Sequence, residues 1–412
     1  MTDDLVATAR QLAQSGRLPE AAVCYERILA GDPRNAEALG TVARLRHAQW
    51  NLDGAIEAFR QLVTVQPLNP AAWHDLGSAL FDRGMADESV AAIRVAVRLR
   101  PDLAQLHMSL ACALISLGQF EEGWRELEWR LAVPEWGLSR GFAQPQWNGS
   151  NIHGRSLLIH NEGGMGDAIQ FVRYVPLLEK YGAELILECP QELIRLFSQI
   201  PGIEQIIARG TSLPGFDFHV PSITIPGIVG TTLQTVPADV PYLHAPQPCI
   251  EFFRNRIPWG GSLKVGLVWA GNVKPQDPRS HLLSEFAPLG DIGNVKFYSL
   301  QKGPESAQKR PENLPLIDFS SDLNDLADTA GLISLLDLVI SVDTSVAHLA
   351  GATGKTVWTL VPCRCDPRWL VNRADSPWYP TMRLFRQETP GDWDGVVRKV
   401  GQALEAFVAE GK

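Results

Sequence analysis

The sequence lacks the features of several protein classes. No apolar stretch reaches about 18 residues, the length that a membrane-spanning helix requires. The N-terminus is acidic and has no apolar core of the secretory type, so we expect a cytoplasmic protein. Lysine and arginine total 37 against 46 acidic residues, without a run of like charge or a basic stripe. This balance argues against a nucleic-acid partner.

Cysteine is also scarce. The six cysteines are scattered along 412 residues, unlike a disulfide scaffold, which fits a reducing compartment. Cys363 and Cys365 form an isolated C-x-C pair, and no second Cys or His pair at zinc-site spacing accompanies it. No acidic D-x-D motif follows a predicted strand. We therefore expect no metal site and no bound cofactor.

Proline instead recurs at a fixed interval in the first third of the chain. Pro33, Pro67 and Pro101 are 34 residues apart. Three further columns keep this period, and apolar residues three and four apart between them indicate helices. The columns are a turn position (Gly16, Trp50, Gly84, Gly118), a small residue (Ala21, Ala55, Ser89, Gly123) and a large one (Tyr25, Phe59, Ile93, Leu127).

These columns predict stacked pairs of antiparallel helices. The small residue lets two helices approach, and proline ends the second helix because it has no N–H to donate. The pattern resembles the tetratricopeptide repeat (TPR), best matched around Trp73, Leu76 and Gly77. We expect an α-solenoid of about four repeats over residues 1–136, followed by a linker over 137–152. Its concave face would bind a protein or peptide; the alternative is a spacer or dimerisation element.

The remaining chain reads as alternating strands and helices, which predicts parallel sheets with helices on both faces. We expect two α/β lobes, at 153–260 and 261–412. Long helices are expected at 167–181, 191–199, 325–336 and 345–353. The expected strands are 156–160, 184–188, 203–208 and 216–220 in the first lobe, and 264–270, 296–300, 316–318, 338–342 and 356–360 in the second.

Ligands of such sheets bind outside the carboxyl ends of the strands, so the loops there are the candidate sites. The first loop follows strand 156–160 and has three interpretations. It could be a dinucleotide-binding turn with Glu188 ending the next strand, although Ile169 stands where a third glycine belongs. It could be a simple turn with Asp167 as a helix cap. The third interpretation makes Asp167 a general base. The loop consists of His160, Asn161, Glu162, Gly163, Gly164, Met165, Gly166 and Asp167.

Three more strand ends in the second lobe carry polar residues. Asp343, Thr344 and Ser345 follow a very apolar strand and open a helix, where free N–H groups suit a diphosphate. His348, one turn later, is a further candidate contact. Basic residues on the loop after strand 264–270 can neutralise a leaving phosphate. The remaining donor-side candidates are Asn272, Lys274, Arg279, Ser280, Gln301 and Lys302.

Two stretches of the sequence resemble a known family. EGGMGDAIQFVRYVPLL and LDLVISVDTSVAHLAGATGKTVW are similar to the two signatures of the heptosyltransferase family, glycosyltransferase family nine. The resemblance implies a GT-B fold with two Rossmann-like lobes, a nucleotide-sugar donor and inversion without a metal. It also implies that Asp167 is the base and that Thr344, Ser345 and His348 contact the donor. The order of repeats and transferase is similar to that of the protein O-linked N-acetylglucosamine transferases.

From these observations we expect an inverting, metal-independent glycosyltransferase whose acceptor is a protein held by the repeats. Three other interpretations remain open. The first is a lipopolysaccharide or glycan transferase whose repeats bind other partners. The second is a TPR scaffold with an inactive transferase fold, and the third is a nicotinamide-linked oxidoreductase.

Overall fold

The computed structural model describes residues 2–257, 260–271 and 279–411. Its internal contacts divide the chain into two compact units. One comprises Met1–Arg140 and Asp366–Val371, and the other comprises Gly141–Cys365 and Asn372–Lys412. The first crossing between the units therefore falls within the segment 137–152. In the part of the chain that the structure describes, no helix is long and apolar enough to cross a membrane.

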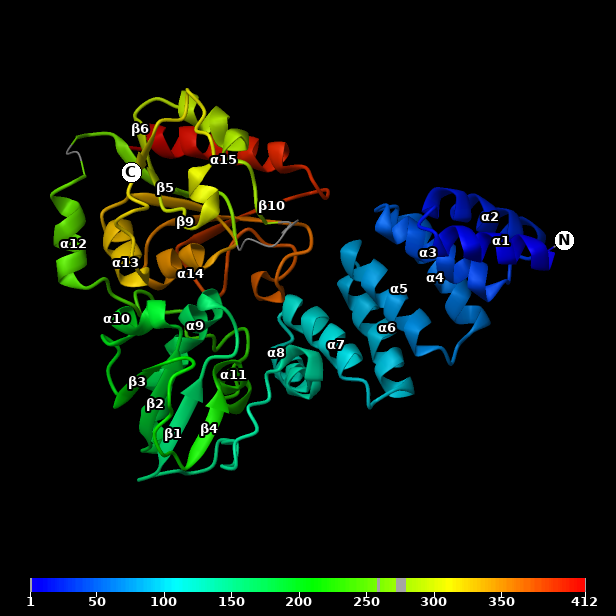
Figure 1. The fold of residues 1–412 in the computed structure, drawn as a ribbon, viewed down its shortest axis with the longest axis horizontal. Helices are drawn as coiled ribbons and strands as arrows, with labels where there is room; N and C mark the ends of the chain where they lie inside the picture. Colours follow the sequence, from blue (N-terminus) through cyan, green and yellow to red (C-terminus); the bar gives the residue numbers. More distant parts are fainter. Residues whose placement is uncertain (1, 258–259, 272–278, 412) are drawn as a thin grey trace. The chain divides into compact units, whose positions relative to one another are not determined.

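The first unit is an α-solenoid of paired helices (Figure 1), as the 34-residue period predicts. Each helix packs on the helices before and after it in sequence, so neighbouring repeats bury a continuous apolar core. The helices are α1 (Thr2–Gln14), α2 (Leu18–Gly31), α3 (Ala36–Ala48), α4 (Leu52–Val65), α5 (Pro70–Asp82), α6 (Ala86–Leu99), α7 (Ala104–Ser116) and α8 (Phe120–Leu127), followed by η1 (Glu128–Ala132) and η2 (Pro134–Trp136).

The turn inside each repeat has a left-handed residue at the column of glycines. Gly16, Gly84 and Gly118 have φ of 78°, 84° and 76°. Trp50 occupies the same position in the second repeat and also has a positive φ, of 61°. A residue with a Cβ is strained in this region. The repeat therefore imposes its turn geometry even where the sequence has no glycine.

Close packing inside the third repeat depends on the small column. Gly77 of α5 lies against Ile93 of α6, and a Cβ at Gly77 would overlap the Ile93 side chain. Ser89 is fully buried, and its Oγ donates to the Gly77 carbonyl over 2.7 Å. The small side chains thus bring α5 and α6 together, and the one polar group among them is satisfied by the backbone.

A short segment from late in the sequence also belongs to the repeat unit. Asp366–Val371, which contains η8 (Pro367–Trp369), packs on α7. The Val371 N–H donates to the Ser116 carbonyl over 2.9 Å, and Trp369 is fully buried. Burial, with the Asp366 carboxylate nearby, raises the pKa of the Cys112 thiol on α7 to about 11. The last repeat is therefore completed by residues outside the array.

The second unit contains two wholly parallel sheets, which confirms the α/β class. The order in the first lobe is β3-β2-β1-β4, with β1 (Ser156–His160), β2 (Glu184–Cys189), β3 (Gln205–Ala208) and β4 (Phe218–Pro221). The order in the second lobe is β10-β9-β8-β5-β6-β7, with β5 (Leu263–Val268), β6 (Val295–Ser299), β7 (Leu316–Asp318), β8 (Leu338–Val342), β9 (Val357–Val361) and β10 (Met382–Arg386).

Helices cover both faces of the second-lobe sheet. Figure 1 shows this sheet between α15 (Trp393–Ala409), drawn in red, and the pair α13 (Leu326–Ser334) and α14 (Ser345–Ala352). Alternate side chains of β5 and β8 form a buried apolar core with α15 and η6 (Leu283–Asp291). Other helical segments of the unit are α9 (Met165–Phe171), η3 (Val172–Tyr181), η4 (Gln191–Leu193), α10 (Ile194–Phe197), η5 (Ser222–Thr224), α11 (Ile225–Ile228), α12 (Gln247–Arg254) and η7 (Pro304–Ala307).

Some expected elements differ from those observed. The expected helix at 167–181 is α-helical only as far as Phe171 and continues as a 3-10 helix, because Pro176 cannot donate to the ladder. Strand β10 was not expected. It follows the aromatic segment at 378–380 and pairs with β9. Helix α12, which precedes the expected lobe boundary at 260, packs on α13 of the second lobe, where Cys249 lies against Gly331.

The packing of Gly77 yields a stability prediction. Gly77→Ala should lower the free energy of unfolding of the array by about 1–3 kcal/mol, because Ile93 must move. Gly31→Ala is the matched control, since an added Cβ there meets nothing within 4 Å. The control should leave stability unchanged or raise it by up to about 1 kcal/mol, through helix propensity. Chemical unfolding followed by circular dichroism would test the pair; equal effects would contradict the packing argument.

Candidate functional site

The loop after β1 folds Asp167 back over its own glycines. Gly164, the N-cap of α9, donates its N–H to the Asp167 carboxylate, with an N···Oδ2 distance of 2.8 Å. A Cβ at Gly163 would overlap the same carboxylate, so this turn requires glycine. Asp167 remains half-buried. It is thus both the helix cap that one interpretation expects and a carboxylate that solvent can reach.

The residues before the glycines are buried. His160 is 2% exposed and Glu162 is 9% exposed. The His160 Nε2 lies 3.2 Å from the His219 Nδ1 on β4, and the Glu162 carboxylate accepts from the Ile223 N–H over 3.3 Å. Asp167 is therefore the more accessible acid–base group of this loop, and His160 and Glu162 contribute to the interior of the lobe.

The loop after β8 presents hydroxyl groups at the start of α14. Thr344 is the N-cap of α14, and its Oγ1 lies 3.0 Å from the Ser341 Oγ. Ser345 begins the helix and is partly exposed, whereas Asp343 is buried. The first N–H groups of a helix have no intrahelical partners and carry a partial positive charge. This loop therefore has the donors and the field that an anionic group requires.

A guanidinium lies against the same loop. Arg279 donates from Nη1 to the Asp343 carbonyl over 3.3 Å, and it is only partly buried. The neighbouring Ser280 accepts from the Gly271 N–H over 3.1 Å. Asn272 and Lys274, also predicted here, lie outside the described residues.

Gln301 and Lys302 have structural partners. The Gln301 amide is 3% exposed; it accepts from the Trp269 and Ala270 N–H groups and donates to the Ala270 carbonyl. The Lys302 ammonium donates to the Ser320 carbonyl over 2.7 Å. Gln301 thus stabilises the backbone after β5, and a direct donor contact by either residue stays a prediction.

The two candidate loops meet where the lobes touch. Helix α9 of the first lobe packs on α14 of the second, and a Cβ at Gly166 would lie 2.9 Å from the His348 Cδ2. His348 is 3% exposed, with its Nδ1 2.8 Å from the Tyr379 hydroxyl and its Nε2 3.9 Å from the Asp343 carboxylate. His348 therefore lies between the lobes, and its expected contact with a donor stays a prediction.

A buried guanidinium joins three distant segments beside this contact. Arg173 of η3 is 5% exposed and donates to the carbonyls of Trp378 and Pro237 and to the Tyr242 hydroxyl. Its guanidinium carbon lies 4.4 Å from the ring centre of Tyr242 and 4.6 Å from that of Tyr379. Cation–π contacts of this kind are strengthened by desolvation. Arg173 thereby links the first lobe to the ring that holds His348.

An ion-pair cluster joins the lobes at a second place. Arg195 of α10 bonds to Asp325, the N-cap of α13, over 2.7 Å, and also to Asp328. Burial opposes ionisation of Asp328, but the hydrogen bonds from Arg195 and Asn324 and the Arg195 charge together outweigh it, and the pKa of Asp328 lies below its ordinary value. These contacts hold the two lobes in one compact unit.

The part of the chain that the structure describes contains no cluster of three His, Cys, Asp or Glu side chains suited to a metal ion. The C-x-C pair has other partners within the protein. The Cys363 thiol donates to the Gln387 carbonyl over 3.3 Å, and the Cys365 sulfur accepts from Arg386 over 3.3 Å.

Sequence reasoning missed Arg173, Tyr242 and the role of Tyr379. Arg173 stands inside the VRYVP stretch of the first signature, which gives no sign of its contacts 69 and 205 residues away. An arginine between apolar residues in a predicted helix is the only local signal. The contacts become visible only when the segments at 237–242 and 378–379 are placed beside η3.

The bond between His348 and Tyr379 yields a second prediction. Tyr379→Phe should destabilise the second unit by about 1–3 kcal/mol, since it removes a partner of a buried imidazole nitrogen. Tyr298→Phe is the matched control, because the Tyr298 hydroxyl is buried in the same lobe with no hydrogen-bonding partner among the described atoms. That change should be neutral or stabilising. Thermal unfolding of both variants would test this; a larger loss at Tyr298 would contradict the assignment.

Comparison with known proteins supports the repeats most directly. Residues 6–64 and 43–104 match the tetratricopeptide repeat model. "Protein FlbA" of Caulobacter vibrioides is 26% identical over 434 residues, covering 97% of this chain and 72% of that protein. A crystal structure of MamA is 21% identical and covers 32% of this chain and 76% of its own, with a TM-score of 0.30. A structure of MamA from AMB-1 is also 21% identical; it covers 33% of this chain and 74% of its own, with a TM-score of 0.31. The match to the repeat model and the paired helices show that the N-terminal region consists of tetratricopeptide repeats. An α/β region with parallel sheets follows it.

Proposed function

We propose that this chain is a glycosyltransferase that moves a sugar from a nucleotide-sugar donor to a protein acceptor, with inversion and without a metal ion. One observation carries the proposal: the first turns of α9 and α14 pack together at Gly166 and His348. Asp167 is next to this contact in sequence, and Thr344 is one helical turn from it. A carboxylate from one lobe and an anion-binding loop from the other thus come from neighbouring positions.

The donor side is built for a diphosphate. The first N–H groups of α14, the hydroxyls of Thr344 and Ser345, and the Arg279 guanidinium surround the end of β8. A cationic group and oriented donors can stabilise the charge that grows on a leaving nucleoside diphosphate. The similarity of this stretch to the donor signature of glycosyltransferase family nine supports the same assignment. His348, which belongs to that signature, lies between the lobes.

The acceptor side has Asp167. Transfer with inversion needs a base that removes the proton of the attacking hydroxyl as the new bond forms. Asp167 is the half-buried carboxylate on the loop after β1, held by the Gly164 N–H. The dinucleotide interpretation is less well supported, because Glu188, its expected ribose partner, is fully buried. The free cysteines suit the reducing compartment that we propose for the enzyme.

The repeats suit a polypeptide acceptor. Polar side chains link the first helices of successive repeats, including Arg44 to Asp75 at 3.5 Å and His74 to Ser109 at 2.9 Å. Arg44 is exposed and the other three side chains are partly buried, so polar groups line the row of α3, α5 and α7. Such a polar row can bind the backbone and side chains of an extended chain.

The donor site can be tested by binding. We expect one of a panel of UDP-, GDP-, ADP- and CMP-sugars to raise the melting temperature, since a ligand that binds only the folded state stabilises it. Thr344→Ala with Ser345→Ala should then weaken that ligand by about 10–100-fold, through lost bonds to a charged group. The control is Ser334→Ala with Thr353→Ala, at the opposite ends of α13 and α14. No ligand in the panel, or equal loss in both variants, would favour the inactive-scaffold interpretation.

The base can be tested by turnover. Asp167→Asn keeps the size and cap of the side chain but cannot accept a proton, so turnover measured with EDTA present should fall about 10²–10⁴-fold. Donor affinity should barely change. Asp392→Asn is the control: Asp392 is the N-cap of α15 and also accepts a backbone N–H at a helix start, from Gly395, so this variant should retain full turnover. Near-normal turnover of Asp167→Asn, with loss in His160→Ala or Glu162→Gln, would move the base elsewhere on the loop.

A further inference from the structure

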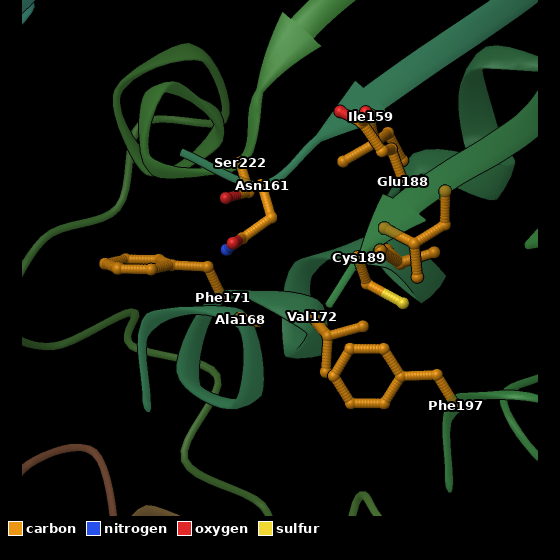
Figure 2. Close-up of a pocket in the computed structure, with 11 residues that line it drawn as sticks. Ile159, Asn161, Ala168, Phe171, Val172, Glu188, Cys189, Phe197 and Ser222 are labelled. Atoms are coloured by element: carbon orange, nitrogen blue, oxygen red, sulfur yellow. The ribbon is translucent and has the colours of Figure 1, made fainter. Parts of the chain in front are cut away.

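A small cavity lies at the carboxyl edge of the first-lobe sheet, next to the loop that carries Asp167. It is lined by the ends of β1 and β2, by Ser222 of η5, and by apolar side chains of α9, η3 and α10, as Figure 2 shows. The space inside it that the centre of a water molecule can occupy is about 10 Å³. A cavity needs roughly 10–15 Å³ by this measure to hold one water molecule. The space therefore matches a single water.

Two buried polar side chains border this cavity. Asn161 is 3% exposed and Ser222 is 5% exposed. Neither the Asn161 amide oxygen and nitrogen nor the Ser222 hydroxyl has a hydrogen-bonding partner among the described protein atoms. Figure 2 shows both groups on the same side of the cavity. An unsatisfied buried amide is costly, so a partner inside the cavity would stabilise the fold.

One charged residue, Glu188, is among the residues that line the cavity. Because side chains alternate along a strand, Glu188, in register with His160, points away from the face of Leu187 and Cys189. Burial raises the pKa of the Cys189 thiol to about 12, so this group is neutral. Phe171, Val172 and Phe197 complete the wall. A neutral molecule that both donates and accepts suits the Asn161 amide and the Ser222 hydroxyl.

We propose that the cavity holds one ordered water molecule that bridges the Asn161 amide and the Ser222 hydroxyl. Asn161 lies in the loop between β1 and α9, and Ser222 begins the segment after β4. The water therefore ties the base of the 160–167 loop to the neighbouring strand end. The water site itself does not depend on the proposed sugar transfer.

The sign of a stability change tests the site. Asn161→Leu replaces the amide with a larger apolar group of the same branched shape, and Ser222→Ala, which cannot overpack the site, removes one hydroxyl. If the water is present, each change removes hydrogen bonds, and the melting temperature should fall by about 2–4 °C or more. If the cavity is dry, each change removes an unsatisfied group, and the melting temperature should stay level or rise. Level or raised values would overturn the proposal.

Two further measurements sharpen this test. Thr359→Val is the control, because the Thr359 hydroxyl is also fully buried with no partner among the described atoms but does not line the cavity. It should not lower the melting temperature. Unfolding in sodium, potassium and choline chloride at one ionic strength should give equal midpoints. Stabilisation by sodium or potassium would show that the cavity binds an ion instead of water, and would overturn the proposal. If Asn161→Leu fails to fold, Ser222→Ala and a crystal structure of the full chain at high resolution decide the matter.

Discussion

The packing of Gly166 against His348 is the constraint on which the candidate site depends. Two helices that follow the strand ends of different sheets can share one site only if their first turns approach closely. A glycine at this position permits that approach, because any side chain would meet the imidazole. The imidazole is in turn held by Tyr379, and the ring of Tyr379 lies beside Arg173. One missing Cβ therefore sets the spacing of two lobes.

This arrangement separates residues that hold the site from those that can meet a ligand. His348, Gln301 and Glu162 are buried and satisfied by protein groups, although their positions at strand ends suggest direct contact. Asp167 and Ser345 keep partial exposure. Parallel sheets bring many polar residues to one edge, but the backbone of the loops there also needs partners. Many polar side chains at such an edge therefore bond to other groups of the protein and not to a ligand.

The sequence predicts the architecture well where a periodic pattern repeats. The 34-residue columns locate the repeats, and the apolar runs at 156–160, 316–318 and 338–342 coincide with β1, β7 and β8. Prediction fails where the determining contact is distant or the signal is short. Strand β10 is defined by its pairing with β9. Arg173 bonds to segments far away in the sequence, which local patterns cannot connect with it. Pro176 did carry a local signal against a continuous α-helix.

The segment Asp366–Val371 has a consequence for how the chain is made and inherited. During synthesis, α7 emerges long before the residues that bond to Ser116 and bury Trp369. The last repeat must therefore wait for most of the second unit before it is complete. The same dependence restricts recombination, because an exchange at the linker would separate α7 from the segment that packs on it. The two units have distinct folds, yet the segment at 366–371 and α7 must be inherited together.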